Sequence, residues 1–505
     1  MVSLAMGIRS ALGPYWLGTN LDPQYCYLFN GLNLASGFPP HHIDHPGTPV
    51  QELVAVVILI SHAIAGHGSV ASDVITRPET YLGRANLALI GLYALVLWGL
   101  GLAMFRATGR WTAGWLAQLT PLLATQSVIA LGRVNPEPML LAFTGLLAAA
   151  IASYLGSPSL RRDTGAAIAA GLCIGLAVAC KITAMPLLLL PLLLFAGLRL
   201  KLVSGAAAML SCALATQPMW GQMGRFWHWV TALTTRTGRY GEGDTGVVAW
   251  AQAPGRFASL LGAEPVFALL LAGSLAVSGY ILWRRRCEGK TGPDRVARAL
   301  TALTVVQCLQ FLMVVKHPAP HYLMPSLGLA GLNLTLIWLL SGRRLSVRHG
   351  RWLAAGLAAI VVVVASPRLG SATGRLAGER DEQLRVFRAG DALRAQGRIA
   401  TYYTASDALY ALAFGNEWAG WRYGGALARL YPDALFYEIW AGRYYTFTGA
   451  LPVDAVLQLA TRSPLYLHGT GGREIAFPTP AKLVIVVPGT LEVVYRVEPV
   501  RRPDT

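Results

Sequence analysis

A polar stretch near the start of the chain carries residue types that could do chemistry. Residues 22–51 read DPQYCYLFNGLNLASGFPPHHIDHPGTPVQ. Asp22 opens this stretch, and a carboxylate at an apolar boundary suits a general base, because partial loss of water raises its proton affinity. The alternative is that Asp22 caps the helix predicted for the residues that follow it. Tyr25 is a polar member of that helix.

A second group of polar residues follows within the same stretch. The segment HHIDHPGTP, residues 41–49, places His42, Asp44 and His45 close together. These side chains could bind a divalent metal or form hydrogen bonds with sugar hydroxyls. Adjacent residues in a loop bounded by proline do not all face one ion, so a structural turn or an acceptor-binding loop is the alternative. The sequence requires no cofactor and leaves a divalent metal open.

Lysines beside apolar runs form a third group. Lys181 lies between two such runs in CKITAMPLLLLPLLL, and Lys316 opens KHPAPHY, which also holds His321 and Tyr322. Because a lysine at the centre of a bilayer costs about 2.5–3.5 kcal/mol, each lysine either snorkels at a helix end or pairs with an anion. Two such cations on one membrane face indicate a lipid phosphate. Glu137, in NPEP, is either a further site acid or a favourable charge at a helix N-terminus.

Long apolar helices must position these residues. Of the 505 residues, 54% are hydrophobic and 13% are charged, and the apolar runs are long enough to cross about 30 Å of hydrocarbon. The fold class is therefore predicted to be mainly α, a polytopic transmembrane helical bundle of about 10–11 membrane helices. The expected helices lie near residues 86–105, 112–131, 138–156, 165–181, 183–198, 203–220, 265–283, 299–315, 322–341 and 352–366.

The distribution of charge predicts orientation rather than a nucleic-acid partner. The formal net charge is +17, but the basic residues fall mainly in short loops between apolar runs, which should therefore be cytoplasmic. The opposite face then holds residues 132–139, Lys181, the long loop 221–264, residues 316–322 and everything after about residue 366. The six cysteines show no CxxC spacing, so neither a disulfide framework nor a zinc site is indicated.

The chain divides into four predicted parts. Residues 1–20 resemble the end of a first membrane helix whose beginning is missing, and residues 21–85 form an external loop if 52–68 is an interfacial helix. Residues 86–366 are the membrane core. Residues 367–505 form a small external α/β domain, with strands expected near 398–403, 464–469, 481–488 and 491–497 and a helix near 454–462. The aromatic residues between 418 and 445 either stack on sugars or form the core of this domain.

In this order the motifs resemble the GT-C class of membrane glycosyltransferases, the superfamily that includes protein O-mannosyltransferases and the lipid A aminoarabinose transferase. Those families carry an acid in the first external loop, as Asp22 does, and a polar or acidic position after the third helix, matched by NPEP. A lysine opens a proline-containing apolar segment, matched by KITAMPLLLLP, and a late basic-aromatic motif is matched by HYLMPSL. The resemblance spans roughly residues 22–340. The first helix and the second acid, here Asn135 with Glu137 nearby, depart from the family pattern.

The resemblance implies transfer of a single sugar from a polyprenyl-phosphate donor to an acceptor, with inversion at the anomeric carbon. Asp22 would be the base. The donor phosphate would be bound by Lys181, Lys316, His321 and Tyr322. Acceptor or sugar binding would fall to Tyr25, His42, Asp44, His45 and Glu137.

The same resemblance implies where the protein works and with what partners. It would lie in the cytoplasmic (inner) membrane, with the site and the C-terminal domain on the extracytoplasmic side. The acceptor would be a lipid, a glycan or a protein; the distribution of the basic residues argues against a nucleic-acid partner. Two other functions stay open: a transporter or flippase of a lipid-linked sugar, and a non-catalytic assembly protein of the cell envelope. A transporter predicts polar residues along helix middles, whereas these apolar runs are nearly free of charge.

Overall fold

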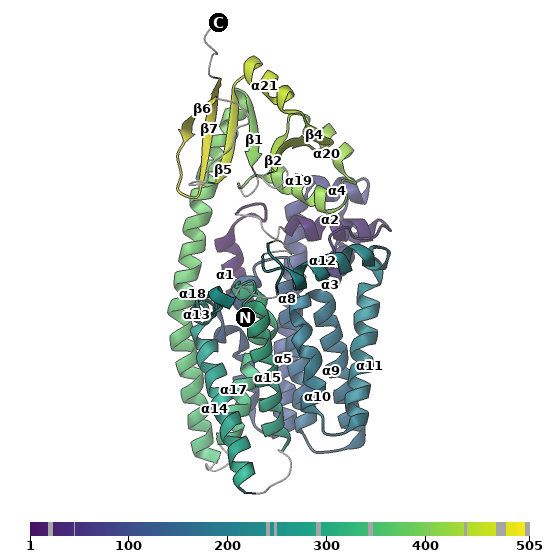
Figure 1. Ribbon diagram of the computed structural model, residues 1–505, viewed down its shortest axis with the longest axis vertical. Helices are drawn as coiled ribbons and strands as arrows, with labels where there is room; N and C mark the ends of the chain where they lie inside the picture. The colour runs from purple at the N-terminus through teal and green to yellow at the C-terminus, as the bar shows by residue number, and fades with distance from the viewer. Residues whose placement is uncertain are drawn as a thin grey trace. The chain divides into compact units, whose positions relative to one another are not determined.

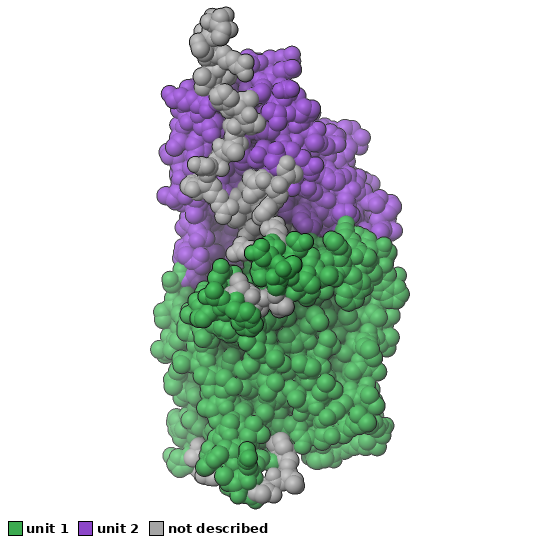
Figure 2. All heavy atoms as spheres, in the orientation of Figure 1, with its two compact units in different colours: residues 1–6, 43–50, 86–371 green, residues 7–42, 51–85, 372–505 purple. Residues whose placement is uncertain are grey.

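The chain forms two units, which Figure 2 colours separately. The computed structural model describes residues 1–18, 24–44, 46–238, 243–246, 250–288, 294–341, 347–402, 405–438, 442–470 and 481–499. Unit 1 comprises residues 1–6, 43–50 and 86–371, and unit 2 comprises residues 7–42, 51–85 and 372–505. Four helices have residues in both units: α1 (Val2–Leu12), α3 (Thr48–Ala65), α5 (Pro78–Thr108) and α18 (Val347–Ala392).

Unit 1 is built from apolar helices that run side by side (Figure 1). Its long helices are α8 (Pro136–Leu155), α9 (Leu160–Cys180), α11 (Leu198–Thr216), α14 (Pro265–Cys287) and α15 (Arg295–Val314). Its shorter helices are α6 (Trp111–Gln118), α7 (Thr125–Ala130), α10 (Leu190–Leu194), α12 (Met223–Thr235), α13 (Ala253–Ala263), α16 (Met324–Leu327) and α17 (Ala330–Ser341). The 3-10 segments are η1 (Thr120–Leu123), η2 (Ile182–Leu189), η3 (Gln217–Gln222), η5 (Trp250–Gln252) and η6 (Pro320–Leu323).

The prediction of a polytopic membrane protein is confirmed, with fewer spans than expected. In the described part of the chain, eight helices are long and apolar enough to cross a membrane, or nine if the bent pair from Pro320 to Ser341 is one span. The expected helices 112–131 and 183–198 are instead broken into shorter pieces. Pro121 and Pro186 lie within these stretches, and a proline has no N–H to continue the α-helical ladder. The long loop expected at 221–264 contains helices α12 and α13.

The interfacial assignment of residues 52–68 stays a prediction. Helix α3 covers most of this stretch, and its length and composition qualify it as a candidate span. Neither property distinguishes a helix that crosses the bilayer from one that lies along it.

Close helix packing in unit 1 depends on glycine. On α9, a Cβ added at Gly171 would lie 2.2 Å from the carbonyl oxygen of Ser204, and one at Gly175 would lie 2.1 Å from that of Ala208. Two small residues four apart let helix backbones approach closely, as is common between membrane helices. The outer surface of α11 stays apolar, since Met209 is 71% exposed. The glycine face of α9 therefore packs against α11, and the exposed face of α11 suits lipid.

The α/β fold predicted for the C-terminal residues is present: in the described part of unit 2 the strands form a mixed seven-stranded sheet, ordered β4-β3-β2-β1-β5-β7-β6. The strands are β1 (Arg398–Tyr402), β2 (Leu435–Glu438), β3 (Arg443–Thr446), β4 (Gly449–Leu451), β5 (Leu465–Thr470), β6 (Ala481–Val487) and β7 (Glu492–Pro499). Strand β1 is parallel to β2 and β5, and the other pairings are antiparallel. The strands predicted from sequence agree with β1, β5, β6 and β7, whereas β2, β3 and β4 were not predicted.

Helices cover both faces of this sheet. Val456 of α21 (Val453–Arg462) packs with Ala400 and Tyr402 on one face, and Val386 of α18 packs with Ile399 on the other. Alternate residues of β1 therefore point to opposite faces, as the pleat requires. The remaining helical elements of unit 2 are α2 (Gln24–Ala35), α4 (Val70–Thr76), α19 (Ala408–Trp418), α20 (Gly424–Leu430) and the 3-10 turn η8 (Leu393–Ala395).

Candidate active site

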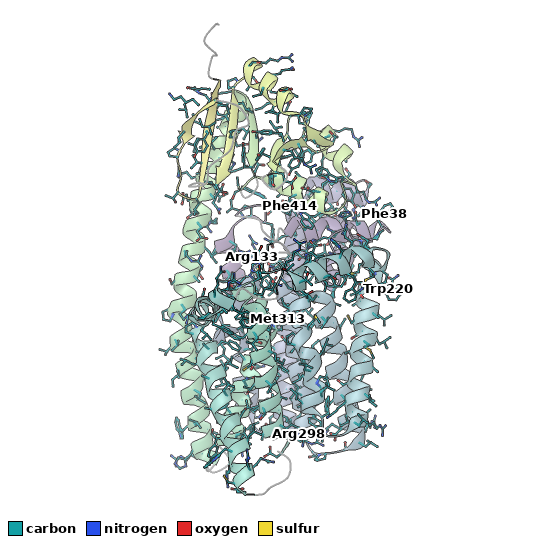
Figure 3. The ribbon with its side chains drawn as sticks, viewed as in Figure 1. Phe38, Arg133, Trp220, Arg298, Met313 and Phe414 are labelled. Carbon is teal, nitrogen blue, oxygen red and sulfur yellow. The ribbon has the colours of Figure 1, made fainter. Side chains whose placement is uncertain are left out.

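The predicted site residues of unit 1 gather at one end of its helices. At the other end, Arg295 at the start of α15 bonds to Asp163 at the start of α9, with N···O distances of 2.8 and 2.6 Å. Arg295 also donates to the carbonyl of Tyr154 at the end of α8, at 2.6 Å. The start of α8 and the ends of α9 and α15 must therefore lie together at the opposite end. Figure 3 agrees, because Arg133 and Met313 lie at one end of this bundle and Arg298 at the other.

Lys181 and Glu137 form a buried ion pair at that end. The lysine follows the last residue of α9 with extended backbone angles, φ −157° and ψ 130°, which turn the chain into η2. Its Nζ lies 2.5 Å from Oε1 of Glu137, which sits in the first turn of α8. The two side chains are 0% and 2% exposed. A lysine so deeply buried is stable only with a partner, so this contact explains a cation next to apolar segments.

Tyr322 places an aromatic ring against the same lysine. The Lys181 ammonium lies 4.8 Å from the centre of the Tyr322 ring. The rings of His321 and His317 also contact the Tyr322 ring, with centroid distances of 4.2 and 5.0 Å. Glu137 lies within electrostatic range of His321 as well as of Lys181. The prolines of HPAPHYLMP shorten the helix to one 3-10 turn, and that turn presents adjacent histidine and tyrosine side chains to the pair.

Two oxygen atoms at this site accept no hydrogen bond from the described residues. They are Oε2 of Glu137 and Oδ1 of Asn135, and both are buried. Asn135 precedes α8 with an extended backbone, and its side chain does not cap the helix. Buried polar atoms are normally satisfied, so acceptors of this kind suit hydroxyl groups of a bound ligand or water.

Part of the opening polar stretch joins this site. Pro46 forms an isolated antiparallel bridge with Lys181, and Ile43 packs on Met219 and Phe226 of η3 and α12. Asp44 lies between these two anchored residues and is half-buried. Residues 43–50 thus belong to unit 1, and within them Pro46 pairs with the backbone of Lys181.

Lys316 has a different environment. Its ammonium donates to the carbonyl oxygen of Leu233 at the end of α12, and burial lowers its pKa. Arg256 of α13 holds the same loop by donating to the carbonyls of Val315 and Lys316, at 3.3 and 2.9 Å. The structure therefore brings Lys181, His321 and Tyr322 together with Glu137, and it gives Lys316 a protein acceptor of its own.

Tyr25 and His42 lie in unit 2 with structural partners. The Tyr25 hydroxyl donates to Oε1 of Glu79 at 2.9 Å, and burial together with that carboxylate raises the pKa of Tyr25 well above its ordinary value. The buried His42 ring makes edge contacts with Tyr27 and Trp418, at centroid distances of 5.6 and 4.8 Å. These contacts pack the two side chains into unit 2.

Asparagines account for the polar character of the opening helix. Asn30 donates to the carbonyl of Trp418 at 3.1 Å, and its Oδ1 accepts from the backbone N–H of His42 at 3.0 Å. Asn33 donates to the carbonyl of Ala419 at 3.1 Å and accepts from the hydroxyl of Tyr423 at 2.9 Å. Helix α2 therefore binds the loop after α19 through side-chain amides.

The remaining predicted residues are Asp22 and His45, and both lie outside the described residues. Within the described ranges, no group of three or more His, Cys, Asp or Glu side chains is placed to hold a metal ion. Because His45 belongs to the proposed metal set, the metal stays a prediction. Sequence reasoning missed Pro46 and Arg256, whose roles depend on contacts with residues far along the chain, for which the sequence carries no local signal.

Comparison with known proteins identifies the class of enzyme. Residues 78–315 match the model of glycosyltransferase family 87. Two crystal structures of ArnT from Cupriavidus metallidurans, one bound to undecaprenyl phosphate and one in the apo state, share the fold with a TM-score of 0.50 each. The identities are 14% and 15%, and each comparison covers 98% of this chain and 97% or 96% of the other. No curated protein matches the chain in sequence.

The predicted GT-C resemblance is therefore confirmed. The protein is a multi-pass membrane glycosyltransferase with an ArnT-like fold, in which a helical membrane part is joined to a C-terminal domain with a mixed sheet.

Proposed function

We propose that this membrane glycosyltransferase moves a single sugar from a polyprenyl-phosphate donor to an extracytoplasmic acceptor, with inversion at the anomeric carbon. The observation that carries the proposal is the buried Lys181–Glu137 pair at the end of the membrane helices, with His321 and Tyr322 beside it. The phosphate group of a membrane lipid lies near the ends of the membrane helices, and its negative charge grows as the bond to the sugar breaks. The ArnT structure bound to undecaprenyl phosphate supports this class of donor.

The chemistry is a direct displacement. An oxygen of the acceptor attacks the anomeric carbon, the bond from that carbon to the phosphate oxygen breaks, and the electron pair leaves with the phosphate. Lys181 offsets the charge that develops on the phosphate, which is the kind of stabilisation that contributes most to many enzymes. Glu137 fixes the ammonium in place, and because an ammonium has several donor hydrogens it can hold Glu137 and a phosphate together. Asp22 accepts the acceptor's proton.

Sugar recognition is assigned to polar side chains at or beside the site, including two buried oxygen atoms that accept no hydrogen bond from the described residues. Oε2 of Glu137 and Oδ1 of Asn135 suit donor-sugar hydroxyls, and Asp44, in the segment bridged to Lys181, suits the acceptor together with His45. Tyr25 and His42 have partners within unit 2, so we assign them to holding the opening stretch. Lys316 is assigned a smaller share of phosphate binding, because its ammonium already has an acceptor in the protein.

Orientation follows from charge. The start of α15 and the end of α14 carry Arg295, Arg298 and Arg284–Arg286, and this end lies opposite the site. Under the positive-inside rule that end is cytoplasmic, so the site faces the extracytoplasmic side of the cytoplasmic membrane. The family match favours a transferase over the transporter and assembly alternatives.

Asp22→Asn tests the assignment of the base. We expect turnover to fall by about a hundredfold to ten-thousandfold while donor binding is unchanged, because the amide keeps the size of the side chain but cannot accept the proton. Native mass spectrometry of detergent-purified protein identifies the co-purifying lipid-linked sugar, which then serves as the substrate. A variant with normal turnover would remove Asp22 from the mechanism. Wild-type protein that holds no polyprenyl-phosphate species, even with undecaprenyl phosphate in excess, would contradict the donor.

A further inference from the structure

Each of two short segments beside the site contains a backbone carbonyl that has no N–H donor in its own 3-10 turn. Lys181 precedes η2, which contains the sequence Thr183-Ala184-Met185-Pro186. His321 lies in η6, and the next residues, Tyr322-Leu323-Met324-Pro325, run from η6 into α16. In a 3-10 helix each carbonyl accepts from the N–H three residues later. That residue is a proline for both Thr183 and Tyr322, and proline has no N–H.

The side-chain amide of Gln310 supplies both missing donors. Its Nε2 lies 3.3 Å from the carbonyl oxygen of Thr183 and 2.9 Å from that of Tyr322. Its Oε1 accepts the hydroxyl of Ser326 in α16. Gln310 belongs to α15 and is only 1% exposed, so these contacts are formed in a region from which water is excluded. One side chain thus joins two carbonyls that lie 139 residues apart in sequence, as the numbers 183 and 322 show.

We infer that Gln310 is a positioning residue, which clamps the two proline-broken segments so that Lys181 meets Tyr322 and His321. The inference rests on the proposed function, in which these residues bind the donor phosphate. An unpaired carbonyl in an apolar interior costs several kcal/mol, so without Gln310 both segments would shift to find other donors. Such a shift moves the ammonium and the ring relative to each other.

A second glutamine on the same helix offers a matched control. Gln307, one turn earlier on α15, is also fully buried, and it exchanges hydrogen bonds with Asn333, with N···O distances of 3.4 and 2.7 Å. Its Nε2 also lies 3.3 Å from the carbonyl of Ser326. It touches neither Thr183 nor Tyr322 in any hydrogen bond of the described residues. Loss of its amide should therefore affect stability without displacing the phosphate-binding residues.

The test compares Gln310→Met with Gln307→Met, a near-isosteric change in both cases. The probe is undecaprenyl phosphate, titrated into detergent-purified full-length protein. We expect the dissociation constant to rise by about tenfold or more for Gln310→Met and by less than about threefold for Gln307→Met, with comparable losses of thermal stability. With donor substrate, Gln310→Met should raise KM more than it lowers kcat. Equal binding by the two variants would overturn the clamp.

A proline variant provides a test that does not depend on the donor. Pro325→Ala restores an N–H three residues after Tyr322, so Gln310→Met should lower the thermal midpoint less in the Pro325→Ala background than in the wild type. Purely additive effects would overturn the clamp. If wild-type protein fails to bind undecaprenyl phosphate, the proposed donor is wrong, and this cycle of variants still decides the role of Gln310. If Gln310→Met does not fold alone, recovery of folded protein in the double variant supports the clamp, and no recovery overturns it.

Discussion

The Lys181–Glu137 pair predicts that stability and activity can be separated at one site. Both side chains are almost completely buried and their charged atoms lie 2.5 Å apart. Removing one partner leaves the other charge buried without compensation, which typically costs about 3–5 kcal/mol. Replacing both partners with apolar residues of similar size is often neutral or stabilising. Lys181→Met should therefore destabilise the protein strongly, and Lys181→Met combined with Glu137→Leu should recover most of that loss.

Activity should behave differently. The proposed role of Lys181 is to stabilise the departing phosphate, and removal of one such donor typically lowers kcat by about a hundredfold to a thousandfold. Glu137→Leu does not restore a positive charge, so the double variant should be stable and still inactive. A purely structural pair would give the opposite outcome, in which recovery of stability also restores turnover.

Two measurements on the same preparations decide between these outcomes. Thermal unfolding in detergent gives the stability of wild type, both single variants and the double variant, and transfer from the co-purifying lipid-linked sugar gives kcat. A Lys181→Met variant as stable as the wild type would show that the ion pair contributes nothing to the stability of the folded protein. An active double variant would remove Lys181 from catalysis altogether.

Two further predictions concern Lys316 and Glu417. Lys316→Ala should lower kcat by less than about tenfold, because the ammonium is bonded to the carbonyl of Leu233, and a loss as large as that of Lys181→Met in the same transfer assay would contradict this. Burial, and then the nearby charge of Glu438, raises the pKa of Glu417 from 4.5 to about 7. Between these values the folded state binds more protons than the unfolded state, so stability should fall as the pH rises from about 4.5 to about 7. The thermal midpoint should lose this slope in Glu417→Gln and keep a shallower one in Glu438→Gln, and an unchanged slope in Glu417→Gln would refute the assignment.

The sequence alone predicted the elements whose signal is local. Alternating apolar residues predicted strands such as β5 and β7, and runs of apolar residues predicted spans such as α9 and α14. The same rule failed for residues 112–131 and 183–198. Hydrophobicity reports how favourably side chains transfer into lipid, and it carries no information about whether the backbone hydrogen bonds of a helix are complete. Pro121 and Pro186 break those bonds in stretches whose composition is that of a membrane helix.

The candidate site was only partly predictable for a related reason. Lys181 could be recognised as anomalous from its apolar neighbours, but its partner Glu137 lies 44 residues earlier and no spacing rule connects them. Polar residues of the opening stretch were assigned to sugar binding as one group. In the structure Tyr25 and His42 have protein partners in unit 2. Asp44 instead belongs to a segment of unit 1 in which Pro46 pairs with the backbone of Lys181. Side chains that bind a protein loop and side chains that bind a sugar are of the same chemical types, so only the fold separates them.

The glycine contact between α9 and α11 has a consequence for how the nascent protein assembles in the bilayer. Gly171 and Gly175 leave room for the backbone of α11 at Ser204 and Ala208, so this pair of helices can associate as soon as both are inserted. At that moment α15 and Tyr322 have not yet been synthesised, and Lys181 at the end of α9 lacks its aromatic neighbour. Glu137 has already been made. We therefore expect the carboxylate to act first as the counter-ion that lets a charged helix end settle during biogenesis, before it takes any part in the mature enzyme.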